Sequence, residues 1–523
     1  MKKTSLFLLL IYNFSLAQDS LYTVFSMIGS LEEPISAIDG LGDLNHDGYD
    51  DFIIRKENTD YCEIYFGGEN IDLTYTLKLF DQPNMESLGT LINVGDLNGD
   101  GYDDYAQNGF LNDGGFPTGK VFVFYGNSKF DATADWEKQS FCIDGLFGSA
   151  MSLLAPSLSG GDINGDGIND LVIGEPYNWC DGIGRVHIFY GGDSLSSTSD
   201  TIIKSKFVED SYGEFVSADA DINGDGFNDV IVSAPNSPGN PNVEAKVFIY
   251  RGSSSNINIV DSLIGLPSLS VVRSVNLKDF NGDGFDDFYV TYANKLFFGS
   301  SDFSLNNFLQ FSSNENTNSF GGTANPIGDI NSDGFSDFLI ADGGHINEND
   351  IMVGASYIDL GNSSPDTNTD FFLEGETKWS GFGGGGLLGD INGDGFMEFF
   401  VSAFKYPDVN NKLGKIYVYS MKKFIVGVDE EINTQPHQYV IEQNYPNPFN
   451  PSTTIKYQIP ADGMVSLRIY DITGQEVKTL VNEAQSKGRY EVNFDASSLS
   501  SGVYFYRLQS GSFNQSMKMI LLK

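Results

Sequence analysis

The chain has 523 residues, with 71 acidic against 30 basic side chains and a formal net charge of −41. So large an excess of negative charge argues against nucleic acid and anionic membranes as partners, and it favours cations. Aromatic residues at 13% and 59 glycines are typical of many short strands joined by tight turns, not of a helical or disordered protein. Because a single core rarely grows to this size, the length predicts two domains.

Residues 1–17 are predicted to be an export signal. Two lysines precede an apolar stretch from Leu6 to Ile11 and a small-residue cleavage site, Ser15-Leu16-Ala17. We expect the mature chain to start at Gln18. No later segment approaches the roughly 18 apolar residues that a membrane helix needs, so no transmembrane segment is expected in the mature chain.

A repeat occupies residues 18–424. The pattern Asp-x-Asn-x-Asp-Gly occurs seven times, at intervals of 50 to 66 residues. An apolar strand follows each copy, and a second strand that usually closes on Gly comes later, as in Leu171 to Ile173 and Arg185 to Tyr190. With an outer strand added, each unit has about four strands, the content of a propeller blade. The repeat therefore predicts a seven-bladed β-propeller.

The segment before the first repeat is expected to close the ring. Tyr22 to Met27 precede the first repeat as Asp370 to Leu373 precede the seventh, and little sequence is left after Tyr419 for an outer strand. We therefore expect residues 21–28 to complete the last blade, so that no sheet edge stays open.

Each repeated loop is predicted to bind calcium. Counted from its first Asp, a loop offers side-chain oxygens at positions 1, 3, 5 and 9, a backbone carbonyl at position 7, and Gly at position 6 for a sharp turn. Two carboxylates about 4 Å apart repel by roughly 4 kcal/mol at an effective dielectric of 20, so such a loop needs a cation. A roomy all-oxygen loop suits Ca²⁺ better than Mg²⁺, which demands stricter octahedral geometry. We expect up to seven structural calcium ions.

The predicted ligands stand at positions 1, 3, 5, 7 and 9 of the seven loops. They are Asp43, Asn45, Asp47, Tyr49, Asp51, Asp96, Asn98, Asp100, Tyr102, Asp104, Asp162, Asn164, Asp166, Ile168, Asp170, Asp221, Asn223, Asp225, Phe227, Asp229, Asp279, Asn281, Asp283, Phe285, Asp287, Asp329, Asn331, Asp333, Phe335, Asp337, Asp390, Asn392, Asp394, Phe396 and Glu398. Seven identical patterns argue against simple turns. An EF-hand is excluded because position 12 is never Glu and falls in a strand. Ser332 and Glu398 depart from the pattern, so loops six and seven are expected to be the weaker sites.

The order of these pieces resembles the FG-GAP repeats of integrin α chains and their bacterial relatives. The third copy is the fullest, with Phe147-Gly148, Gly161 to Gly167 and Val172 to Pro176. The resemblance covers about residues 20 to 424 and implies that the metal loop joins the first two strands of a blade. It also implies a ligand face opposite the calcium loops, in loops 107–119, 174–184, 233–245 and 402–414. Candidate anchors there are Phe110, Phe116, Tyr177, Trp179, Phe404 and Tyr406, unless these rings pack over the blades.

A second domain follows a polar linker at residues 425–438. Residues 439–523 contain runs typical of strands at about 455–459, 464–470, 488–494, 503–509 and 514–522, which predict a small Ig-like β-sandwich. The entry Tyr445 to Phe449, the segment Tyr470 to Val477 and the terminal Met519 to Lys523 resemble the type A sorting domain of the Por (type IX) secretion system. That resemblance implies a Gram-negative, Bacteroidetes-like source, handling by the secretion machinery, and a place at the cell surface or outside the cell.

The sequence favours an adhesion or recognition module over an enzyme, and we assign no catalytic residue. Its four histidines, His46, His187, His345 and His437, fall in different units. Gly381 to Gly386 match a nucleotide-binding pattern but precede a strand, where a Rossmann fingerprint would open a helix. Three cysteines, Cys62, Cys142 and Cys180, are too few for a disulfide framework, although one Cys142–Cys180 bridge is conceivable. The ligand would be an unknown extracellular protein or glycan. A hydrolase or lyase acting on surface glycans or lipids, and a purely structural surface protein, are the alternatives.

Overall fold

The computed structural model describes residues 20–522 apart from residues 72, 76, 82–84, 112–117, 128–129, 131–132, 141–146, 149–156, 177–181, 207–210, 236–244, 256, 265–271, 313–318, 423–439, 442–443, 445–446, 448, 460–461, 487, 498 and 511–512. The predicted export signal, the predicted linker, Cys142 and Cys180 lie outside the described residues. Cys62 is a buried free thiol. The chain divides into two compact units, residues 1–424 and 425–523.

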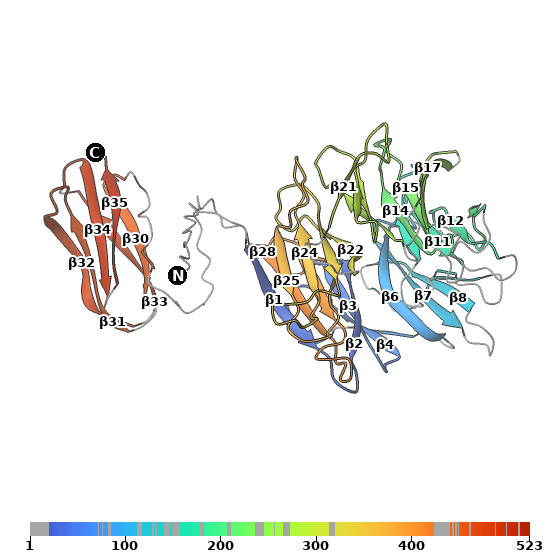
Figure 1. Cartoon of the computed structure of the whole chain (residues 1–523), viewed down its shortest axis with the longest axis horizontal. Coiled ribbons are helices and arrows are strands. Elements are labelled where there is room, and N and C mark those ends of the chain that lie inside the picture. The colour runs from blue at the N-terminus through green and yellow to red at the C-terminus, as the bar shows by residue number, and fades with distance from the viewer. Residues whose placement is uncertain are drawn as a thin grey trace, which may run out of the picture. The chain divides into compact units, whose positions relative to one another are not determined.

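The described residues of the first unit form seven four-stranded antiparallel sheets, numbered here as blades one to seven (Figure 1). In order they are β2 (Ile35–Gly42), β3 (Asp51–Lys56), β4 (Tyr61–Tyr65) and β5 (Leu77–Phe80); β6 (Met85–Gly95), β7 (Asp104–Leu111), β8 (Thr118–Phe124) and β9 (Trp136–Gln139); β10 (Leu158–Gly161), β11 (Asp170–Glu175), β12 (Arg185–Phe189) and β13 (Thr201–Lys204); β14 (Phe215–Ala220), β15 (Asp229–Ala234), β16 (Lys246–Arg251) and β17 (Asn258–Ile264); β18 (Ser274–Lys278), β19 (Asp287–Val290), β20 (Lys295–Phe297) and β21 (Phe308–Gln310); β22 (Phe320–Gly328), β23 (Asp337–Asp342), β24 (Ala355–Asp359) and β25 (Phe371–Glu374); and β26 (Phe382–Gly389), β27 (Glu398–Ala403) and β28 (Lys415–Lys422) with β1 (Ser20–Ile28).

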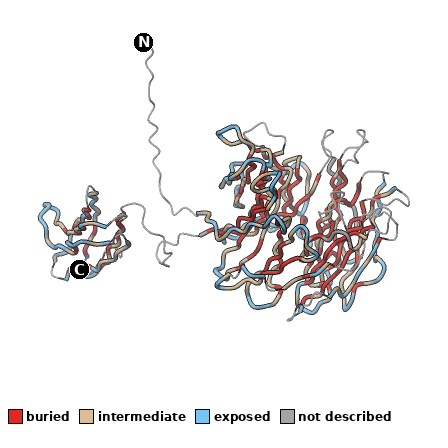
Figure 2. Tube along the Cα trace, turned by 90° about the horizontal axis from the view of Figure 1, so that it is seen from below, coloured by how far each residue is buried: buried red, intermediate tan, exposed pale blue. Residues whose placement is uncertain are grey.

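The blades form a closed ring. The first strands β2, β6, β10, β14, β18, β22 and β26 contact one another in that order, and β26 contacts β2. Apolar clusters lie between adjacent blades; one joins Leu41 and Ile53 of blade one to Tyr105 and Phe122 of blade two. Figure 2 shows that the buried residues lie along the strands and that the exposed residues lie mainly in the connections. The predicted all-β fold class is confirmed, and burial between neighbouring sheets explains why most second strands are apolar along their middle residues.

The N-terminal strand completes the last blade, as expected for residues 21–28. β1 pairs antiparallel with β28 from Ser20 opposite Lys422 to Ile28 opposite Lys415, with a bulge between Thr23 and Phe25. The sheet order is therefore β1-β28-β27-β26. The first and last strands of the unit are hydrogen-bonded to each other, so the ring is closed by pairing of its two ends.

Blade six departs from its neighbours at one buried position. In the other six blades, an aromatic residue on the third strand faces the start of the second strand: Tyr65, Phe124, Phe189, Tyr250, Phe297 and Tyr419. Blade six places Asp359 there, opposite Phe338. Asp359 is only 3% exposed, and neither carboxyl oxygen finds a hydrogen-bond partner among the described residues. Burial raises the pKa of Asp359 well above its usual value, and the charges of Asp370 and Asp366 add to the shift.

Replacing Asp359 with Leu should stabilise the protein. An unsatisfied buried polar group costs about 1–3 kcal/mol, which the apolar side chain removes. Because the folded-state pKa is raised, the folded chain holds a proton that the unfolded chain loses, so wild-type stability falls as pH rises from the unfolded pKa towards the folded one. Chemical denaturation between pH 4 and 8 should therefore show a smaller decline for Asp359→Leu. The exposed Asp302→Leu is the matched control. An equal decline in the wild type and in Asp359→Leu would contradict this account.

The second unit is a two-sheet sandwich. One sheet has the order β29 (Val440–Ile441), β30 (Ser452–Ile459), β33 (Gly488–Asp495), and the other has the order β32 (Glu476–Gln485), β31 (Gly463–Tyr470), β34 (Gly502–Ser510), β35 (Phe513–Leu521). Alternate residues of both sheets, among them Ile455, Leu467 and Tyr506, are buried in one shared core. The strand Glu476–Gln485 was missing from our expectation, because it lies at a sheet edge and most of its side chains are exposed.

Candidate metal-binding loops

The seven repeated loops share one position in the fold. Each joins the first to the second strand of its blade, as loop 43–50 joins β2 to β3 and loop 390–397 joins β26 to β27. Because the first strands line the ring side by side, all seven loops lie at the same end of it. The sequence pattern thus becomes a circle of acidic loops.

Within a loop, backbone amides hold the first carboxylate in place. In the fourth loop, Asp221 Oδ1 accepts hydrogen bonds from the amides of Gly224 (2.7 Å) and Asp225 (3.2 Å), and Oδ2 accepts one from Gly226 (2.9 Å). The carboxylate at position 5, Asp225, accepts the amide of Phe227 at 3.1 Å. Gly226 has φ = +87°, a left-handed conformation that side chains with a Cβ rarely adopt. The turn therefore needs Gly at position 6, and it leaves the carboxylates of positions 1 and 5 near the surface.

The acid at position 9 is the buried anchor of the loop. Asp229 Oδ2 accepts the amide of Ile222 (3.1 Å), and Oδ1 accepts that of Gly252, just after the third strand (3.0 Å). Burial raises the pKa of Asp229 to about 7; the two amide hydrogen bonds oppose the shift, and the charges of Asp225 and Asp221 add to it. The pKa is likewise raised, mainly by burial, to about 7 at Asp51, Asp104, Asp170 and Asp287, and to about 8 at Asp337 and Glu398.

The donor set of the loops fits calcium in its chemistry. Within the described part of the chain, no three carboxylate, imidazole or thiol groups converge on one point, because the position-9 acid faces inward and the other two lie at the surface. Every donor is nonetheless an oxygen. Asp221 Oδ1 accepts two amides, but Asp221 Oδ2 and Asp225 Oδ1 accept one backbone amide each, so each keeps a second lone pair. The like charges that help to raise the pKa of the position-9 acid are those that a bound cation would offset.

Neighbouring loops are bonded to one another, which the sequence did not reveal. The position-8 amide of one loop donates to the position-1 carbonyl of the preceding loop, as Asn228 does to Asp162 (2.9 Å) and Asp50 to Asp390 (3.1 Å). The position-7 side chain also covers position 4 of the preceding loop. A Cβ added at Gly165 would lie 2.3 Å from the ring of Phe227, and equivalent contacts occur at Gly224, Gly282 and Gly393. Position 4 is therefore Gly in most loops because the next blade's side chain occupies the space.

Loops one and six carry a side chain at position 4. His46 and Ser332 have φ values of 58° and 54°, in the left-handed region. The His46 ring meets Tyr102 of the next loop edge-on at 4.2 Å, and the Ser332 hydroxyl donates to the Gly395 carbonyl at 3.1 Å. Both exceptions thus keep a contact with the following loop, at a backbone cost of about 1–2 kcal/mol.

Family comparisons agree with this architecture. An FG-GAP-like repeat model matches residues 221–290, an FG-GAP repeat model matches residues 155–189, and a model of the secretion system C-terminal sorting domain matches residues 443–522. The chain contains FG-GAP repeats and a secretion-system sorting domain. The sorting domain indicates export by type IX secretion to the cell surface or the extracellular space.

Curated relatives of the FG-GAP repeats include both a phospholipase and integrin alpha chains. The chain is 33% identical to phosphatidylinositol-glycan-specific phospholipase D of Rattus norvegicus over 29% of this chain and 19% of that protein. It is 32% identical to integrin alpha-PS5 of Drosophila melanogaster over 32% of this chain and 16% of that protein. It is 29% identical to integrin alpha-5 of Xenopus laevis over 26% of this chain and 14% of that protein. The chain thus spans less than a fifth of the length of these relatives.

The candidate ligand anchors of the FG-GAP repeats behave differently from our expectation. Phe110 is 4% exposed and belongs to the interior of blade two, so its assignment as an exposed anchor is wrong. Phe404 and Tyr406 are partly buried and pack against the apolar clusters beside blade seven. Phe116, Tyr177 and Trp179 lie outside the described residues. In the part of the chain that the structure describes, no helix has the length and apolar character to cross a membrane.

Proposed function

We propose that this chain is an exported recognition module whose propeller is held in shape by calcium. The single observation that carries the proposal is the circle of seven acidic loops, five of which are hydrogen-bonded to the preceding loop through a backbone amide. Calcium would be held by the side chains of positions 1, 3 and 5 and the carbonyl of position 7. The position-9 acid, which the sequence led us to expect as a further ligand, is buried and would support the loop instead. Affinities on the order of 10⁻⁴ to 10⁻³ M, usual for extracellular modules, would make the metal structural.

The proposed role in recognition rests on the export of the chain and on the similarity of its repeats to integrin alpha chains. The sorting domain directs the propeller to the outside of the cell, and integrin alpha chains are among the relatives of its repeats. A rigid propeller presents its remaining loops and channel on a fixed frame, which suits binding. We therefore rank recognition of an extracellular protein or glycan above a purely structural role.

Hydrolysis is the second candidate. A serine, a histidine and a glutamate that contact one another in blade three favour it, as does the likeness to a phospholipase. His187 Nδ1 lies 2.8 Å from Ser199 Oγ, and its Nε2 lies 3.1 Å from Glu175 Oε2. Glu175 also accepts the Ser140 hydroxyl at 2.5 Å and is 2% exposed, so it ties the second strand of blade three to the third strand and to the end of blade two. This cross-strand tie accounts for the residues without catalysis, and we rank the hydrolase second.

A glycan and protein array tests the proposal. The calcium-loaded full chain should bind at least one extracellular glycan or protein, lose the signal in EGTA, and regain it when calcium is restored. The control is Asp302→Asn, an exposed change outside the loops, which should bind as the wild type does. Absence of binding would favour a structural protein, and release of cleaved glycan or lipid would favour the hydrolase.

A further inference from the structure

A cavity of about 980 Å³ opens inside the ring of first strands. Residues of five blades line it, with most of the wall supplied by blades one, six and seven. A volume of this size suits a small ligand. The metal loops follow the first strands and Arg273 directly precedes β18, so this arginine lies towards the end of the cavity opposite the metal loops.

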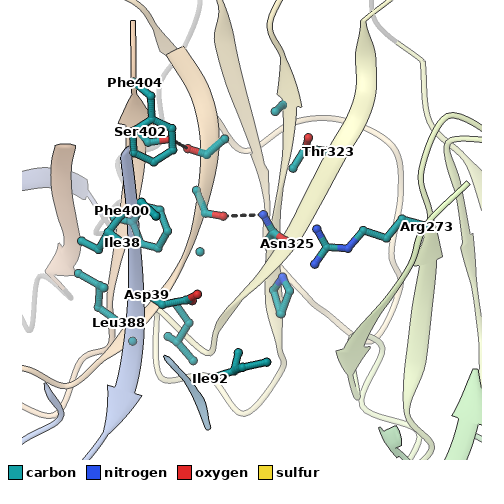
Figure 3. A pocket seen from close by; sticks show the side chains of 18 of the residues that line it. Ile38, Asp39, Ile92, Arg273, Thr323, Asn325, Leu388, Phe400, Ser402 and Phe404 are labelled. Carbon is teal, nitrogen blue, oxygen red and sulfur yellow. Dashed lines mark hydrogen bonds between the residues drawn. The ribbon is translucent and has the colours of Figure 1, made fainter. Parts of the chain in front are cut away.

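Arg273 is the feature of the cavity that needs an explanation. Among the described residues, no hydrogen bond or ion pair engages its guanidinium, which lies 5.7 Å from the ring of Phe215. Burial lowers the pKa of Arg273, and the nearby charge of Asp39 opposes the shift. Figure 3 shows the guanidinium pointing into the cavity towards Asn325. In a chain with a net charge of −41, a half-buried cation that lines a cavity and has no ion-pair partner among the described residues marks a place for an anion.

The rest of the wall offers polar groups and aromatic faces. The Asn325 amide donates to the Gly385 carbonyl at 2.6 Å, and the Ser402 hydroxyl donates to the Gly384 carbonyl at 3.0 Å (Figure 3). Phe400 and Phe404 stand on the same wall. Fixed amides and hydroxyls hydrogen-bond to ligand hydroxyl groups, and aromatic faces pack against the C–H surfaces of a sugar ring.

We propose that the cavity binds a sugar acid of hexuronate type, with its carboxylate on Arg273. This inference deepens the proposed recognition function and rests on it. A planar guanidinium matches a carboxylate through two parallel hydrogen bonds. Asp39, across the cavity, can accept a sugar hydroxyl but repels a second anionic group, which disfavours sugar phosphates with two negative charges. Neutral sugars leave the guanidinium without a counter-charge.

Calorimetry on the calcium-loaded full chain tests the inference with D-galacturonate and D-glucuronate as probes. At least one should bind, whereas D-galactose, D-glucose and D-glucose 6-phosphate should bind at least tenfold more weakly. Arg273→Gln should weaken binding at least tenfold, and Arg273→Lys less so, because Lys keeps the charge but loses the paired geometry. Arg251→Gln, on the third strand of blade four, is the matched control and should bind normally.

A second variant tests the location without touching the charge. A Cβ added at Gly384 would meet only the Ser402 hydroxyl, at 3.7 Å, so Gly384→Leu fits the backbone and fills the cavity. It should abolish uronate binding while the melting temperature stays within a few degrees of the wild type. Uronate binding that survives both Arg273→Gln and Gly384→Leu would overturn the inference, as would a preference for the sugar phosphate or no uronate binding at all. Array binding by the same protein would then leave the recognition function standing without this ligand.

Discussion

Removing calcium should lower the melting temperature of the propeller by about 10 °C or more. Calcium at about ten to a hundred times its dissociation constant stabilises the folded state by about 1.4 to 2.7 kcal/mol per site, and up to seven sites act on one ring. A change of several kcal/mol moves the melting temperature of a domain this large by many degrees. Differential scanning calorimetry of the full chain in 10 mM calcium and in EGTA measures the shift.

The expected size of the effect follows from the contacts between loops. Among the described residues, five of the seven loops donate a backbone amide to the preceding loop and cover its position-4 glycine, so loosening one loop by charge repulsion removes contacts from its neighbour. Asp225→Asn takes one charge from a loop and should reduce the calcium-dependent shift, whereas Asp302→Asn should not. An identical melt and identical circular dichroism in calcium and EGTA would show that the loops are simple acidic turns.

The sequence predicted these loops well because their chemistry is local. Asp, Asn and Gly at fixed spacing determine the turn by themselves. The hydrogen bonds from backbone amides to Asp221 and Asp225 span at most five residues. The apolar second strands were equally visible, because they are buried on both faces. Calcium binding by these turns is the proposal that the melting experiment tests.

Features that depend on residues far apart in the chain could not be read in the same way. The contact between Gly393 and Tyr49 joins the two ends of the propeller. Asp359 stands out only when its strand is aligned with the third strands of the other six blades, which have an aromatic residue at the same position. Arg273 belongs to no motif; only the closed ring turns it towards the cavity. Phe110 was misassigned because a loop was expected where β7 continues to Leu111.

Deleting residues 18–30 should lower the melting temperature sharply and promote association between copies. The deletion exposes the edge of β28 along its whole length and removes Val24, Phe25 and Met27 from the cluster between blades one and seven. Full burial of a large apolar side chain is worth about 1.5–3 kcal/mol, so three partly buried ones together with the lost strand pairing should cost several kcal/mol. An open edge also offers a template for a strand from a second molecule. Calorimetry and size-exclusion chromatography measure the two effects.

Single substitutions separate strand pairing from packing in the same strand. Phe25 lies 6.2 Å from Phe52 of blade one, whereas Ile28 is 51% exposed on the same strand. Phe25→Ser should therefore destabilise the ring by about 2–4 kcal/mol, and Ile28→Ser should change it by less than about 0.5 kcal/mol. If the deletion and Phe25→Ser both melt as the wild type does, the ring must hold without its first strand, and the contacts between the acidic loops would have to keep blades one and seven together.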